Sequence, residues 1–135
     1  MIALLLLQTT LGALPRQTLP PSGCAAFLWS RADTPQLVAM MRAEPAQLRV
    51  SLDGKPTDLP RVAAEGATAK GLAATSRYEG GGTVATLELN AVERPDLADG
   101  ALVQEATLTV TRAGADTVVT ALGGLVGCAP ANGGR

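Results

Sequence analysis

The sequence predicts an all-β protein, an antiparallel β-sandwich or small barrel of about seven to nine short strands. Short apolar or alternating segments recur along the chain, separated by turn signals at intervals of about eight to twelve residues. Only three side chains are aromatic, Phe27, Trp29 and Tyr78, so Leu, Val, Ala and Met must fill the core, which favours backbone-paired structure. The cysteines, Cys24 and Cys128, lie near opposite ends of the chain and would tie its first and last segments together.

A chain of 135 residues, of which 47% are hydrophobic, suits a single domain. The apolar run Ile2 to Leu7, together with Leu11 to Leu14, has the length of the apolar region of a secretory signal and is well short of the ~20 residues that span a bilayer. The sequence therefore predicts a signal peptide (1–13, cut somewhere between 13 and 23), an extended Pro-rich lead-in (14–23), one β-domain (24–129) and a disordered tail (130–135).

The even cysteine count and the export signal together favour a Cys24–Cys128 disulfide. It would close a loop of 105 residues (24 to 128 inclusive), which is worth roughly 4–5 kcal/mol in the chain-entropy model. One alternative is lipid attachment at Cys24, although Pro21 stands where lipoprotein signals carry an aliphatic residue. The other alternative is a pair of buried thiols in a cytosolic protein.

In the first half of the chain, the clearest local signal is Asp53-Gly54, which predicts a tight type I′ turn between two alternating arms. Pro56 and Pro60 predict that the return arm is short and lies at a sheet edge, where a missing N–H is harmless. The strands expected in this half are 25–30, 36–43, 47–52 and 55–59, with a turn at 33–35.

In the second half, Gly66 and Gly71 would each cost a helix about 1 kcal/mol, so we expect a loop from residue 60 and then a strand from 70 to 78. Val84 falls outside the alternation of the next strand, which predicts a bulge near Ala85. The remaining expected elements are strand 83–92, a polar connection 93–100, strand 105–112, a turn at 113–115, a return strand 116–122, and a last segment 125–128 after Gly123-Gly124.

The composition excludes several kinds of chemistry. The chain has no histidine, which removes the commonest general base, Ser-His and Cys-His catalysis and the commonest zinc ligand. We therefore expect neither a metal nor a cofactor.

The charge pattern argues against a nucleic-acid partner. The formal net charge is −1 and the positive and negative residues are interspersed, so the sequence has no basic patch that would bind nucleic acid. A membrane barrel would need aromatic girdles, so no membrane span is expected.

Few residues are candidates for a site. Trp29 and Tyr78 would form a small binding face if both were exposed together; otherwise they pack in the core. Glu93, Asp96 and Asp99 cluster in one loop and are weak candidates for a cation site, against a simple solvated turn.

These observations favour a non-catalytic periplasmic or secreted domain that binds a protein or a cell-envelope polymer through a sheet edge or a loop face. One alternative is a carboxylate-dependent hydrolase, which requires acidic side chains to converge in one pocket. The other is an inhibitor or accessory module that inserts the loop 60–74 or 93–100 into an enzyme. The acidic residues available to the hydrolase are Glu79, Glu88, Glu93, Asp96 and Glu105.

Overall fold

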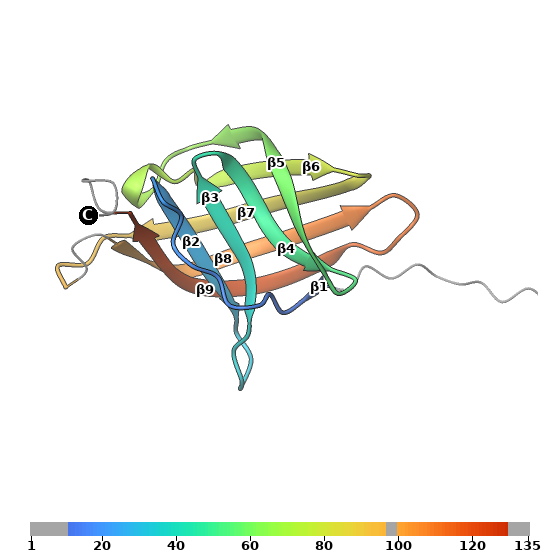
Figure 1. Cartoon of the computed structure of the whole chain (residues 1–135), viewed down its shortest axis with the longest axis horizontal. Coiled ribbons are helices and arrows are strands. Elements are labelled where there is room, and N and C mark those ends of the chain that lie inside the picture. Colours follow the sequence, from blue (N-terminus) through green and yellow to red (C-terminus); the bar gives the residue numbers. More distant parts are fainter. Residues whose placement is uncertain (1–10, 97–99, 130–135) are drawn as a thin grey trace, which may run out of the picture.

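A computed structural model describes residues 11–96 and 100–129 of the chain (Figure 1). These residues form nine strands in one sheet, of which eight close into an antiparallel barrel while the ninth, β1, lies beside β4. The predicted all-β antiparallel fold is confirmed, with a barrel as its architecture. The elements are β1 (Leu11–Gly12), β2 (Cys24–Ser30), β3 (Leu37–Ala43), β4 (Ala46–Leu52), β5 (Lys55–Glu65), the 3-10 helix η1 (Ala69–Gly71), β6 (Thr75–Gly80), β7 (Thr83–Val92), β8 (Gly100–Arg112) and β9 (Val118–Cys128).

From β2 to β9, each strand pairs with the next in an up-and-down order, and β9 returns to pair with β2. This closing pair runs in continuous register from Cys24 opposite Cys128 to Ser30 opposite Leu122. The two cysteines form a disulfide with a Cα–Cα distance of 4.0 Å, so the predicted covalent tie is confirmed. Because β2 and β9 are the first and last strands of the barrel, the bond locks the seam at which the barrel closes.

Side chains fill the barrel interior, as expected for eight strands. Strand β7 shows the alternation that the sequence predicted, with Leu87 and Leu89 buried and Glu88 and Asn90 exposed. The interior is therefore a packed core, and the surfaces available for binding lie on the outside of the barrel. The largest fully buried side chains are Tyr78, Leu28, Met41, Leu48, Leu59, Leu72, Leu87, Leu108, Leu122, Val50, Val103 and Val110.

The Asp53-Gly54 turn is confirmed, because both residues have positive φ angles, 52° and 84°, as a type I′ turn requires. The short return arm and the loop after Pro60 are wrong, because β5 continues to Glu65. Its first half pairs with β4 as far as Pro60, and its second half pairs with β6 from Arg61 onward. Each half therefore has a described strand on one side only, which explains how a long strand accommodates its two prolines.

One strand boundary and one bulge also differ from expectation. The strand predicted from Lys70 starts at Thr75, since residues 66–74 turn over the barrel end and bury Leu72 there. The bulge predicted near Ala85 is wrong: Ala85 faces the interior in regular register with Tyr78, and the irregularity lies between Asn90 and Ala91. A small inward residue is the reasonable neighbour for the buried tyrosine ring.

Strand β8 begins at Gly100 rather than near residue 105. Strand β9 runs unbroken through Gly123-Gly124, where the sequence predicted two separate segments. Both glycines pair with β2, and Gly124 also pairs with Val103 of β8, whereas Gly123 lies at the irregularity between Val103 and Ala106. This tertiary pairing overrides the low strand propensity of glycine.

Residues 11–23, which we call the N-terminal strap, lie along the outer face of the barrel. Leu14 is buried, and its N–H donates to the Leu37 carbonyl at 2.7 Å. Gln17 accepts a hydrogen bond from Arg49 Nη1 at 2.7 Å. The same guanidinium donates to both carboxylate oxygens of Asp58, at 2.7 and 3.0 Å, and this hydrogen bonding lowers the pKa of Asp58.

Of the predicted signal peptide, residues 1–10 lie outside the described residues, as does the predicted tail 130–135. Within the described ranges, no helix has the length and apolar character needed to cross a membrane.

Candidate binding surfaces

The structure does not bring the two candidate aromatic residues together. Tyr78 is 0% exposed inside the barrel, where its hydroxyl accepts a hydrogen bond from Ser76 Oγ at 2.9 Å. Burial raises the pKa of this phenol. Trp29 instead lies on the outer side of β2, beside the Phe27 ring, with 6.5 Å between the ring centroids. Trp29 and Tyr78 would form a binding face only if both were exposed together, and they are not. Of the two, only Trp29 lies where a ligand could reach it.

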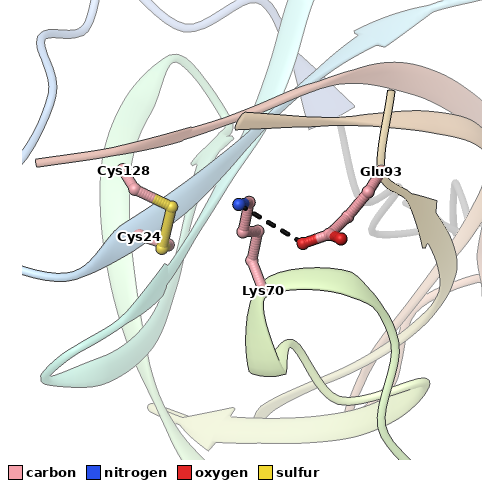
Figure 2. Close-up of a disulfide and its surroundings, with 4 residues drawn as sticks. All are labelled: Cys24, Lys70, Glu93 and Cys128. Carbon is pink, nitrogen blue, oxygen red and sulfur yellow. Dashed lines mark ion pairs between the residues drawn. A yellow bond between two sulfur atoms is a disulfide. The ribbon is translucent and has the colours of Figure 1, made fainter. Parts of the chain in front are cut away.

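The acidic loop candidates are engaged by neighbouring cations. Glu93 Oε1 lies 3.3 Å from Lys70 Nζ, and Asp96 Oδ1 lies 3.3 Å from Arg94 Nε. Figure 2 shows Lys70 reaching from the 66–74 turn toward Glu93, beside the disulfide. Asp99 lies outside the described residues. Within the part of the chain that the structure describes, no group of three or more His, Cys, Asp or Glu is placed to hold a metal ion.

One candidate site is a shallow, largely apolar groove of about 440 Å³ on the outer face of β2, β9 and β8, which we call the Trp29 groove. Its floor is glycine backbone: a Cβ added at Gly124 would lie 3.1 Å from Trp29 Cε3 and would overlap the Phe27 carbonyl oxygen. A larger residue at this position would therefore displace the indole ring and fill the groove. The lining residues are Trp29, Ser30, Arg31, Pro35, Leu102, Val103, Gln104, Gly123, Gly124 and Leu125.

The chemistry of the Trp29 groove is apolar with one positive charge. Leu125 is 46% exposed on its rim, a large apolar side chain left in water. Arg31 Nε donates to the Leu122 carbonyl at 3.3 Å, which holds the guanidinium above Gly123. None of the lining residues is acidic, so the charge of Arg31 is not neutralised within the groove.

Sequence reasoning found Trp29 but missed the rest of this groove. The available signal was Gly123-Gly124, since glycine inside a strand often marks a close approach of another chain or a ligand. The low strand propensity of glycine instead predicts a break between two segments at this pair. The contribution of Arg31 has no local signal, because this residue meets β9 only through the closure of β2 against β9. Leu102 lies opposite Leu125 through the pairing of β8 with β9.

Two of the five acidic residues named for a hydrolase do share a groove. Glu88 and Glu105 line a shallow surface of about 340 Å³ on β7 and β8, together with Asn90, which lies opposite Glu105 in the register. Both carboxylates are exposed on a strand face. A catalytic carboxyl pair usually needs one member shielded from water, so this arrangement lacks the burial that hydrolysis would use. The hydrolase hypothesis stays a prediction.

The loop proposed for insertion into an enzyme has a different form in the structure. Residues 60–65 belong to β5, and the following turn folds back onto the barrel with Leu72 only 1% exposed. It is tied to the barrel end by the ion pair between Lys70 and Glu93. The second proposed loop, 93–100, includes residues 97–99, which lie outside the described ranges.

No protein-family model, curated protein or solved structure matches this chain.

Proposed function

We propose that the protein is a non-catalytic binding module of the periplasm or extracellular space that holds an extended, apolar segment of a protein partner in the Trp29 groove. The observation that carries this proposal is the pairing of a half-buried Trp29 with an exposed Leu125 along a groove whose floor is strand glycine. The disulfide supports the proposed periplasmic or extracellular location, because disulfides persist in oxidising compartments.

The form of the groove favours an extended segment. The groove is shallow and runs across β2, β9 and β8. The indole ring of Trp29 and the guanidinium of Arg31 lie over its glycines, so a partner would contact these two side chains along the length of the groove. Apolar contact is supplied by Trp29, Pro35 and Leu125, and burial of one large apolar side chain is worth about 1.5–3 kcal/mol. Trp is also among the residue types that dominate binding energy at protein interfaces.

Arg31 adds a charge preference to this apolar contact. Its guanidinium is held by the Leu122 carbonyl through one N–H, so its other donors are available to a ligand. A carboxylate on the bound segment would make a charge-assisted hydrogen bond with it. The preferred partner segment is therefore apolar with one acidic side chain or a terminal carboxylate.

A selection of displayed peptides on the oxidised protein tests this proposal. Val119 provides the matched control for Leu125: both are exposed apolar residues of β9, at 65% and 46%, but Val119 lies outside the groove. Selected peptides should bind the wild type and Val119→Glu equally and bind Leu125→Glu at least about ten-fold more weakly. Binding should also shift the fluorescence of Trp29, the single tryptophan.

Circular dichroism of both variants establishes that they fold. The proposal is overturned if the enriched peptides bind Leu125→Glu as well as the wild type. It is also overturned if no peptide shifts the Trp29 emission while soluble cell-wall glycan fragments do, since the groove would then serve a polymer. Arg31→Gln should lower the affinity only of those peptides that carry a carboxylate.

A further inference from the structure

The second half of β5, residues Arg61 to Glu65, is a sheet edge without a described neighbour on its outer side. The pairing of β4 with β5 ends at Pro60, and from Arg61 onward β5 pairs with β6 alone, regularly from Ala63 to Glu65 and with a register irregularity between Arg61 and Ala63. Figure 1 shows β5 bending in its middle, away from β4, to run along β6 at the top of the barrel. The whole segment is exposed, including Val62 at 54%. Such an edge offers a row of N–H and C=O groups to another strand.

The charges on this edge are self-complementary. In an antiparallel pair of two copies centred on Ala63, Arg61 of each copy stands opposite Glu65 of the other. Neither Arg61 nor Glu65 forms an ion pair with a described residue of its own chain. Between them lie only Val62, Ala63 and Ala64, small side chains that leave room at the two-fold axis. A parallel in-register pair would instead place Arg61 beside Arg61, which is unfavourable.

We propose that the β5 edge, Arg61 to Glu65, pairs antiparallel with the same edge of a second copy of this chain. The interface is isologous, and two charge pairs related by the two-fold axis set its register. Five residues a side make a small interface, so the dimer is a weak one that forms at high protein concentration.

This inference goes beyond the proposed function and does not depend on it. In the strand order of the barrel, β5 and β9 are four places apart in either direction, so the edge and the Trp29 groove lie on opposite sides. A β5-to-β5 dimer therefore leaves both grooves free and facing outward. Two grooves in one particle would raise the apparent affinity for a partner with repeated segments.

Sedimentation equilibrium of the full oxidised chain, up to about 1 mM, measures the dimerisation constant. Arg61→Glu and Glu65→Arg should each weaken dimerisation at least about ten-fold, because each places like charges opposite one another. An equimolar mixture of these two variants should recover the wild-type affinity, since every cross-pair is again of opposite sign. Lys55→Glu, on the half of β5 that pairs with β4, is the control and should change nothing.

Circular dichroism identifies any variant that fails to fold, and the charge swap Arg61→Glu with Glu65→Arg in one chain should dimerise like the wild type. The proposal is overturned if the wild type is a monomer throughout the concentration series. It is equally overturned if the single variants dimerise as the wild type does, or if mixing them restores nothing.

Discussion

Removal of the disulfide, by Cys24→Ala with Cys128→Ala, should produce the largest loss of stability of any change outside the core. The bond closes a loop whose ends are 104 positions apart, and constraint of the unfolded chain over about 100 residues is worth ~4.7 kcal/mol. The other six residue pairs of the β2–β9 seam, from Ala25 opposite Gly127 to Ser30 opposite Leu122, remain hydrogen-bonded neighbours without it. The native barrel should therefore persist, and the effect should arise mainly in the unfolded state.

Urea unfolding followed by circular dichroism measures this loss. A loss of ~4.7 kcal/mol is between about 30% and nearly all of the roughly 5–15 kcal/mol that stabilises a typical domain. At about 4 °C per kcal/mol for a chain of this size, the melting temperature should fall by roughly 15–20 °C. The m-value should rise, because the unlinked denatured chain exposes more surface.

Reductant should lower the stability of the wild type and leave the double variant unchanged. The intact mass of the wild type should rise by two hydrogens on reduction. If that mass change is seen and the variant still loses less than about 1 kcal/mol, the loop-entropy reasoning is refuted. If removal of the disulfide barely changes the free energy of unfolding, the denatured chain must keep β2 and β9 close together even without the bond.

Three further outcomes follow from individual contacts. Gly124→Ala should cost about 1–3 kcal/mol in urea unfolding, because the new Cβ overlaps the Phe27 carbonyl, whereas Gly123→Ala should cost clearly less, because its Cβ would come within 3.1 Å only of the flexible end of Arg31. Equal losses would contradict this account. Burial raises the pKa of Tyr78, so the buried neutral phenol contributes fully to stability below pH ~10, and this contribution is lost as the pH rises through the folded pKa. The absorbance of tyrosinate should therefore appear only when circular dichroism reports unfolding. The pKa of Asp58 is lowered, so its ion pair contributes above pH ~4 and is lost as the pH falls through the folded pKa. Asp58→Asn should remove no more than about 1 kcal/mol at pH 7, since the pair is largely exposed, and little at pH 3; a larger loss at pH 3 would be inconsistent with this direction.

Local patterns in the sequence determined which segments are strands and how several of them turn. Alternation along 83–92 predicted the buried face of β7, and Asp53-Gly54 predicted the type I′ turn. These features depend on side chains within one or two neighbouring residues. The disulfide was predictable for a different reason: the chain has only two cysteines, and a predicted export signal favours their oxidation.

Only the tertiary structure decided which strands are neighbours. Alternation shows that one face of a strand is buried, but the partner on either side is chosen by pairings distant in sequence. That choice closes β2 against β9, keeps Gly123-Gly124 within one strand, and divides β5 between β4 and β6. It also turns Tyr78 inward and leaves Trp29 outside. The Trp29 groove therefore depends on the closure of β2 against β9, and the β5 edge depends on the division of β5 between two partners, because both arrangements are set by strand pairing and not by local side-chain patterns.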